Sequence, residues 1–201
     1  MIVMTQIKEI VNRFHHVTRE MLPVPRQQLV LLEKYGYVKH VSKNTLLHSP
    51  GEKSVDYYFI CSGLVRFYYL TDNGKEVNKS FVETNRFFAA PFNILQQQYP
   101  RYYVEALEDT VLLCIPMTLI ERLCESNIHW SNLVRIQFNY LVEKKVTKEA
   151  QLLLSSAQER YLSLVEDSPG LVDKLPNYHI ASYIGVTQEA LSRIRKRINQ
   201  R

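Results

Sequence analysis

The sequence contains no long apolar run, and its first residues are too polar for an export signal. No stretch of about 18 apolar residues occurs in the 201-residue chain, so we expect no membrane-spanning helix. Lys8, Glu9 and Arg13 interrupt the apolar residues near the N-terminus, which excludes the apolar core of a signal peptide. We therefore expect a cytoplasmic protein with no membrane partner.

Cysteine and histidine are few and scattered. The three cysteines, Cys61, Cys114 and Cys124, form no C-x-x-C pair. None of the six histidines stands four residues from another, the spacing that places two imidazoles on one helix face. These spacings exclude a disulfide framework and a recognisable metal site. We expect reduced thiols and no metal or other cofactor.

Catalytic signatures are missing as well. The chain has no G-x-S-x-G nucleophile elbow, no Walker loop and no G-x-G-x-x-G dinucleotide fingerprint. Its composition, 46% hydrophobic and 22% charged, is that of an ordinary globular protein. No residue is predicted to be catalytic, and we do not expect an enzyme.

What the chain does contain is positive charge gathered near its C-terminus. Residues 187–201 hold five basic residues and one acid, which accounts for most of the net charge of +5. Such a segment is typical of proteins that bind polyanions. A solvated basic tail has the same composition, so charge alone leaves both interpretations open.

Before residue 116 the pattern changes from helices to strands. Residues 5–20 and 26–35 show helical spacing of apolar residues, and Gly36 ends the second segment. Residues 37–115 then form short Val-, Phe- and Tyr-rich runs separated by turn signals about every ten residues. Several runs are apolar on both faces, and Asp72-Asn73-Gly74 is a hairpin signal. This pattern predicts a β-barrel or jelly roll.

A helical region follows, from residue 116 to about residue 166. Its long central part, 130–154, carries an apolar stripe that begins with Trp130 and Leu133. Such a helix either covers the barrel or pairs with its counterpart in a homodimer, and the pattern alone does not decide between them.

The most specific pattern lies beyond residue 178 and predicts a helix-turn-helix. Ala181 is a small residue in the first helix, where two helices must cross closely. Gly185 suits a turn with a left-handed backbone, and Thr187 is a suitable N-cap for the second helix.

The second helix separates into an apolar side and a hydrogen-bonding side. At about 100° per residue, Leu191, Ile194 and Ile198 fall within one arc that is expected to pack inward. The opposite side suits a DNA major groove, where arginine bonds guanine, glutamine bonds adenine and glutamate accepts from cytosine. The predicted base-reading residues are Gln188, Glu189, Ser192 and Arg193. The predicted phosphate contacts are Thr187, Arg195, Lys196 and Arg197. An amphipathic helical hairpin used for protein contacts is the alternative.

Four segments resemble the Crp/Fnr superfamily of bacterial transcription regulators, which are related to the cyclic-AMP receptor protein. Residues 43–52 resemble the family's turn before Gly-Glu, and 58–65 its Y-x-I-x-x-G-x-V strand pair. Residues 72–76 resemble its hairpin, and 188–193 its recognition-helix run. The resemblance implies an α+β fold: an N-terminal β-roll of the cyclic-nucleotide-binding type (a jelly roll), a long dimerisation helix and a C-terminal, winged-helix-like helix-turn-helix.

The resemblance also implies domain limits and partners. The expected parts are a sensor domain at 1–128, a dimerisation helix at 129–155 and a DNA-binding domain at 156–201. The expected partners are a near-palindromic double-stranded DNA site, a second copy of the chain, and RNA polymerase. The family's β-hairpin wings are expected to be reduced, since 168–177 is short for a hairpin.

The nucleotide-binding cassette departs from the family pattern. Cyclic-AMP binders use a Gly-Glu pair and an Arg-Ser/Thr-Ala run, but this chain has Ala89-Ala90 and Arg101-Tyr102 at those places. A ribose and a phosphate without these partners would leave buried polar groups unpaired, at about 1–3 kcal/mol each. Ala89, Ala90, Arg101 and Tyr102 therefore mark a degenerate effector pocket, and cyclic AMP is not the expected effector. No cysteine cluster for iron–sulfur precedes Cys61, and no residue is singled out as a haem ligand.

Together these patterns predict a homodimeric, sequence-specific DNA-binding regulator whose small-molecule effector is unidentified. The alternative is a small-molecule-binding β-barrel protein whose C-terminal helices mediate protein contacts. A cupin-type metalloenzyme shares the barrel pattern but requires clustered histidines, and His40 and His48 stand eight residues apart.

Overall fold

The computed structural model describes residues 2–21, 24–52, 56–89 and 100–200. The chain forms two compact units. The first contains Met1–Tyr69 and Ser80–Asn139, and the second contains Leu70–Lys79 and Tyr140–Arg201. Within the described ranges, no helix is both long and apolar enough to cross a membrane.

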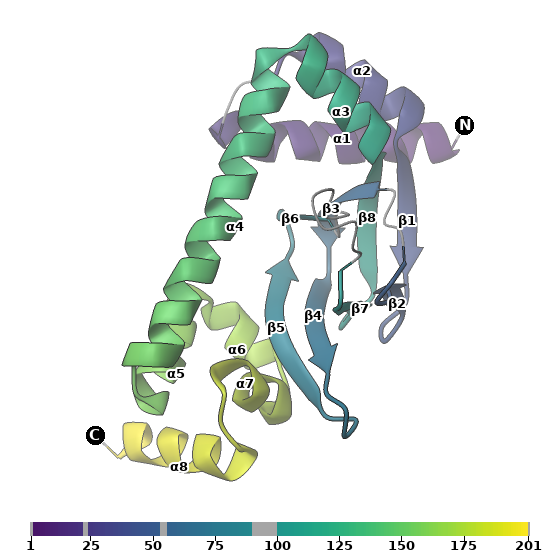
Figure 1. Cartoon of the computed structure of the whole chain (residues 1–201). Helices are drawn as coiled ribbons and strands as arrows, with labels where there is room; N and C mark the ends of the chain where they lie inside the picture. The colour runs from purple at the N-terminus through teal and green to yellow at the C-terminus, as the bar shows by residue number, and fades with distance from the viewer. Residues whose placement is uncertain (1, 22–23, 53–55, 90–99, 201) are drawn as a thin grey trace. The chain divides into compact units, whose positions relative to one another are not determined.

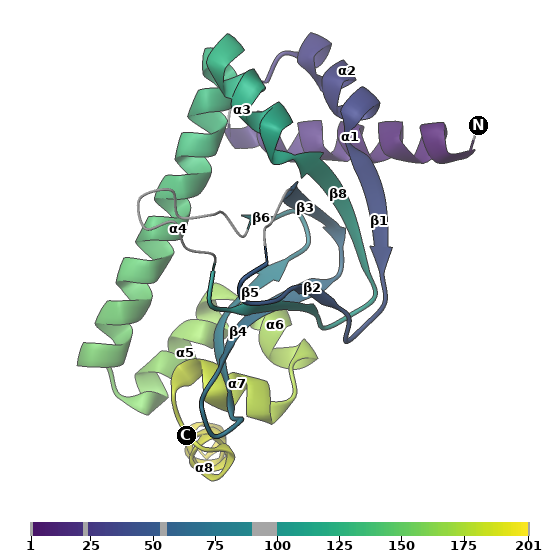
Figure 2. The same ribbon diagram turned by 45° about the vertical axis from the view of Figure 1, so that its right-hand side comes forward.

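The described strands form two four-stranded antiparallel sheets with the orders β1-β8-β3-β6 and β2-β7-β4-β5. Figure 2 shows β1 and β8 running side by side, in a register that pairs Tyr37 with Cys114. The predicted α+β fold with an N-terminal β-roll is confirmed. The strands are β1 (Tyr37–Val41), β2 (Leu46–His48), β3 (Asp56–Ser62), β4 (Leu64–Leu70), β5 (Glu76–Glu83), β6 (Phe87–Ala89), β7 (Tyr103–Ala106) and β8 (Thr110–Pro116).

The central strands are apolar on both faces because each face packs against a different layer. Along β3, Tyr58 and Ile60 join an apolar core that draws on both sheets. The alternate residues Phe59 and Cys61 join a second core that includes the N-terminal helices. Period-two alternation thus places every second residue in a different core, which explains the absence of a polar face.

At one position of the β-roll, a neighbouring side chain lies so close to the backbone that only glycine fits. Gly63 connects β3 to β4 with a φ of +111°, in a region that other residues rarely adopt. A Cβ atom there would collide with the side chain of Thr110.

Two N-terminal helices, α1 (Ile2–Met21) and α2 (Arg26–Tyr35), cover the sheet that contains β3 and β8 (Figure 1). Val11 and Phe14 of α1 are each 1% exposed. The Phe14 ring stands edge-on to Phe59 with its centroid 5.5 Å away. Both predicted helices are present, and α1 extends slightly beyond its predicted ends.

The predicted helical region after residue 116 is divided into three helices. These are α3 (Met117–Ser126), α4 (Ile128–Leu154) and α5 (Ala157–Asp167). A capping box begins α5, because Ser156 Oγ accepts from the Glu159 N–H while the Glu159 carboxylate accepts from the Ser156 N–H. The remaining helices are α6 (Pro169–Lys174), α7 (Asn177–Ile184) and α8 (Gln188–Asn199).

Candidate nucleic-acid interface

The turn between α7 and α8 has the geometry that the sequence predicts. Gly185 adopts the left-handed conformation, with φ 73° and ψ 42°. The N–H groups of Gly185 and Val186 donate to the carbonyls of Ser182 and Ala181 and close the end of α7. Ala181 is 2% exposed, in accordance with a close crossing of helices.

The second helix of this pair, α8, begins at the predicted cap and buries the predicted side. Thr187 Oγ1 accepts a hydrogen bond from the Ala190 N–H at 3.2 Å. Leu191 and Ile194 are 0% and 7% exposed, so they anchor the helix to its own unit. The helix is therefore capped at one end and held along one face.

All four predicted base-reading residues lie on the exposed side of α8. Gln188, Glu189, Ser192 and Arg193 are exposed, and they alternate with the buried residues at helical spacing. The pKa of Glu189 lies below its usual value. The main cause is a hydrogen bond from the backbone N–H of Glu189 to its own carboxylate, followed by a hydrogen bond with Thr187 and the positive charge of Arg193. The carboxylate therefore remains a hydrogen-bond acceptor at neutral pH, as contact with a cytosine amino group requires.

The predicted phosphate contacts fall into two groups. Thr187, Lys196 and Arg197 are exposed. Arg195 instead is half-buried, and its Nε donates to Tyr161 Oη at 3.0 Å. Its Nη1 donates to Asn177 Oδ1 at 2.6 Å. The Arg195 guanidinium thus connects α8 to α5 and α7.

Arg160, which the sequence analysis did not identify, forms hydrogen bonds to the end of the first helix of the pair, α7. Arg160 Nε donates to the carbonyl of Ile184 at 2.8 Å, and its Nη1 donates to the carbonyl of Ser155 at 2.6 Å. These bonds satisfy carbonyls at the ends of α7 and α4. Arginine content alone does not reveal such a role, because the partners are distant main-chain atoms.

The tip of the β4–β5 hairpin belongs to the same unit as the helix-turn-helix and bonds to α7. The Asn78 N–H donates to Ser182 Oγ at 2.9 Å, and Ser182 Oγ lies 3.4 Å from the Glu76 carbonyl. The Asn78 side-chain amide donates to the carbonyl of His179 at 3.1 Å and lies 3.0 Å from its Nδ1. Asn78 and His179 are 4% and 3% exposed, so this polar contact is buried.

The second half of α4 carries apolar side chains that are exposed to solvent. Leu141, Val142 and Leu152 are 43–49% exposed, Val146 is 60% exposed and Leu153 is 76% exposed. At helical spacing these residues form one stripe along the helix. The sequence left dimerisation open for the whole stretch 130–154, but Trp130 and Leu133 at its start are buried and only the second half is exposed in this way.

The four residues of the predicted effector pocket are only partly within the described structure. Ala89 ends β6 and pairs with Tyr57 across the sheet, whereas Ala90 lies outside the described residues. Arg101 is exposed. Tyr102 packs against the roll interior with its ring centroid 5.3 Å from that of Phe67, and burial raises its pKa to about 12.

A buried histidine in the same roll was not predicted from the sequence. His48 is 6% exposed, and its Nε2 has no hydrogen-bond partner among the described residues. Its ring centroid lies 6.1 Å from that of Tyr102. Burial lowers the pKa of His48, against the opposing charge of Glu52. The lowered pKa favours the neutral form of this ring.

The described residues show no metal-binding cluster of three or more His, Cys, Asp or Glu side chains. The three cysteines are free thiols, and Cys61 and Cys114 are buried. Burial raises the pKa of the Cys61 thiol to about 11, so it is protonated at neutral pH and a poor nucleophile.

Residues 38–127 match the family model of the cyclic nucleotide-binding domain. The chain is similar to the structure of FixK2 from Bradyrhizobium japonicum, with a TM-score of 0.74, 16% identity, and 82% of this chain and 85% of that one covered. It is also similar to a Eubacterium rectale protein assigned to the Crp/Fnr family of transcriptional regulators. There the TM-score is 0.69 and the identity 18%, with 88% of this chain and 84% of that one covered.

A 50-residue part of the chain is 38% identical to an uncharacterized protein of Haemophilus influenzae. The match covers 25% of this chain and 39% of the Haemophilus protein. This relative is therefore similar to one segment of the chain only, and it gives no information on activity.

Proposed function

We propose that this protein regulates transcription. The proposal starts from the match of residues 38–127 to the cyclic nucleotide-binding domain, in a chain with the Crp/Fnr fold. In this proposal the protein is a homodimer that binds a near-palindromic site on double-stranded DNA. Contact with RNA polymerase follows from the same resemblance. No enzymatic step is part of the proposal.

The observation that carries this proposal is the exposed side of α8. It presents an amide, a carboxylate, a hydroxyl and a guanidinium on a helix that is capped at Thr187 and anchored by Leu191 and Ile194. A rigid helix with such groups can enter the major groove and contact base edges. We assign base reading to Gln188, Glu189, Ser192 and Arg193.

Phosphate contacts fall to the remaining exposed residues of this region. Lys196 and Arg197 supply positive charge near the end of α8, and the Thr187 hydroxyl lies at its start. Phosphate contacts set affinity and register without reading sequence. We leave Arg195 out of this set because both of its hydrogen-bonded nitrogens are committed to Tyr161 and Asn177.

The stripe on the second half of α4 supports the homodimer. Exposed valine and leucine side chains at helical spacing gain free energy when a second helix covers them, at about 25 cal/mol per Å² of apolar surface. A parallel pair of α4 helices covers both stripes at once. The two α8 helices are then expected to contact half-sites about 34 Å apart, one turn of DNA.

The effector site is proposed to lie in the roll, where the cassette has lost its nucleotide partners. Tyr102 occupies part of the interior with an aromatic ring, and nearby His48 offers an unpaired nitrogen. These groups favour a small apolar or aromatic molecule with one hydrogen-bond donor over a cyclic nucleotide. The β4–β5 hairpin, bonded to α7 through Asn78, then passes a change in the roll to the helix-turn-helix.

In-vitro selection of bound duplexes from a random pool tests the proposal. We expect enrichment of a two-fold symmetric sequence whose half-sites are separated by one helical turn. Arg193→Ala should change the enriched sequence, whereas Lys174→Ala, an exposed lysine on α6, should leave it unchanged. Failure to enrich any sequence in dilute buffer contradicts the proposal and favours the protein-contact alternative for the C-terminal helices.

A further inference from the structure

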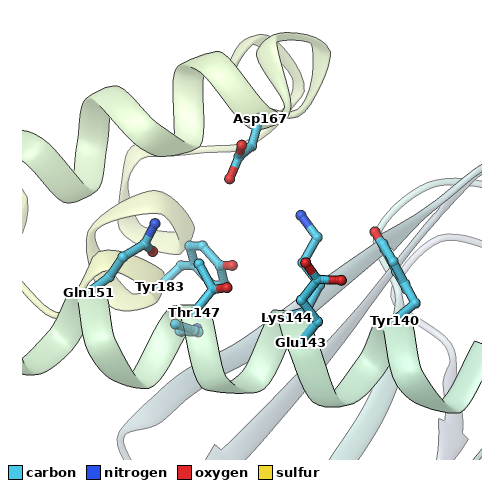
Figure 3. Close-up of a pocket in the computed structure, with 8 residues that line it drawn as sticks. Tyr140, Glu143, Lys144, Thr147, Gln151, Asp167 and Tyr183 are labelled. Carbon is cyan, nitrogen blue, oxygen red and sulfur yellow. The ribbon is translucent and has the colours of Figure 1, made fainter.

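A polar pocket lies within the second unit, on the side of α4 that faces α5 and α7 (Figure 3). Its volume is about 260 Å³. This is just below the range of about 300–1,000 Å³ typical of small-molecule sites, so an occupant must be small. The residues that line it are Tyr140, Glu143, Lys144, Thr147, Lys148, Gln151, Asp167 and Tyr183.

Lys148 is the most constrained of these residues. Its Nζ donates to the carbonyl of Lys79 at 2.7 Å and lies 3.5 Å from the centre of the Tyr183 ring. Burial, and then the charge of Lys79, together lower the pKa of Lys148 to about 7. Burial, together with the charge of Lys145, also lowers the pKa of Lys79 to about 8. Neighbouring ammonium groups repel one another, so an anionic group placed beside Lys148 would be stabilised there.

The same pocket also contains negative charge. Figure 3 shows the carboxylate of Asp167, at the end of α5, and the ammonium of Lys144, on α4, both directed into the space between the helices. Glu143 lines the wall next to Lys144. A simple anion would be repelled by these two carboxylates, and a simple cation by the lysines.

We propose that this pocket binds a small zwitterion of amino-acid size, with its carboxylate at Lys148 and its ammonium at Asp167. The proposal uses both signs of charge on the pocket wall and the small volume. Thr147 and Gln151 add a hydroxyl and an amide at hydrogen-bonding positions, although the Gln151 Nε2 already donates to Ser163 Oγ at 2.8 Å.

An occupant of this pocket would connect three helices that position the helix-turn-helix. Lys148 belongs to α4, Asp167 to α5 and Tyr183 to α7, and α7 is joined to α8 by the Gly185 turn. Binding would therefore restrict the motion of α7 relative to α4. This makes the pocket a second effector site, separate from the β-roll and located in the DNA-binding unit.

The test is titration of the full-length protein with each of the twenty standard amino acids, one at a time, by isothermal calorimetry. We expect at least one to bind at one molecule per chain. Lys148→Met and Asp167→Asn should each weaken its binding at least about tenfold, the usual effect of losing one charge-assisted hydrogen bond. The matched controls Lys174→Met and Glu166→Gln change exposed residues of the same unit that do not line the pocket, and should bind as the wild type does.

A second readout separates binding at Lys148 from a general effect on folding. A carboxylate beside the Lys148 ammonium raises its pKa from about 7, so the complex takes up protons near neutral pH. The other ionisable groups around it are Lys79, Tyr140, Glu143, Lys144, Asp167 and Tyr183. Heats measured in buffers of different ionisation enthalpy should reveal this uptake, and Lys148→Met should abolish it. Binding of none of the amino acids, or binding unaffected by both pocket variants, overturns the proposal. Because Asp167 is exposed, its variant keeps the test valid if Lys148→Met fails to fold.

Discussion

Asn78 and His179, which are 101 residues apart in the sequence, are joined by two contacts from one side-chain amide. The amide nitrogen of Asn78 can only donate, so the Nδ1 atom of His179 serves as the acceptor. The proton of a neutral ring is then on Nε2. The hairpin tip and α7 therefore hold each other through a buried, specifically oriented polar pair.

Asn78→Ala should weaken the second unit by about 1–3 kcal/mol, because it removes the buried hydrogen bonds that the Asn78 side chain donates to His179. Hydrogen exchange of the α7 amides measures the loss, since the variant should expose α7 more often than the wild type does. Lys75→Ala, at an exposed position of the same hairpin, is the control and should exchange as the wild type. Equal protection of α7 in the Asn78 variant would show that the hairpin does not stabilise the helix.

Thr187→Ala should destabilise α8 by about 0.5–2 kcal/mol, because the Ala190 N–H loses its hydroxyl acceptor. Urea denaturation followed by circular dichroism measures the change. Thr187→Ser keeps the acceptor and should lie close to the wild type. If the serine variant is as unstable as the alanine variant, the threonine methyl group and not the cap is responsible.

The sequence predicts helix α8 but not every contact that its side chains make. The helical wheel correctly separates Leu191 and Ile194 from Gln188 and Arg193, because helix periodicity is a local property. The wheel cannot show that Arg195 bonds to Tyr161 and Asn177, since these partners are set by tertiary packing.

The same limit applies to the β-roll and its contacts. Apolar runs and turn signals predict the strands and the turns between them, because these signals lie within a few residues. The burial of His48 and the hairpin contact of Asn78 depend on chain segments that are far away in sequence. A histidine or an asparagine in a polar run carries no local sign of either role.

Arg193→Ala and Lys196→Ala should have different effects on DNA binding. The first should cost about 1–3 kcal/mol on the selected site and relax the preference at one base pair. The second should weaken binding to selected and random duplexes alike and lower the salt slope by about one. Affinities measured on both duplexes over a series of salt concentrations distinguish the two. Identical profiles for the two variants would contradict the assignment of separate base and phosphate roles.

Val146→Glu should convert the proposed dimer to a monomer with little effect on the fold of the chain. Val146 is 60% exposed, so the change removes little contact within one chain, but it places a charge in the proposed interface between two α4 helices. Light scattering during gel filtration should show at least a tenfold rise in the dissociation constant, about 1.4 kcal/mol. Val30→Glu on α2, at a site that is 57% exposed, controls for loss of an exposed valine. A Val146 variant that remains dimeric at the wild-type affinity would place the interface elsewhere.

His48 should make the β-roll less stable as the pH falls. Burial lowers its pKa from the ordinary value of 6.5, so the unfolded chain binds a proton more readily than the folded chain does. Stability is therefore highest above the unfolded pKa and decreases as the pH falls below it, until the folded chain also gains the proton. Guanidinium unfolding followed by the fluorescence of Trp130, the single tryptophan, measures this slope.

His48→Leu should flatten the dependence of stability on pH, because the side chain no longer titrates and the unpaired Nε2 is removed. His16→Gln, at an exposed position of α1, should retain the wild-type slope, and an unchanged slope in His48→Leu would show that another group controls the acid sensitivity of the roll.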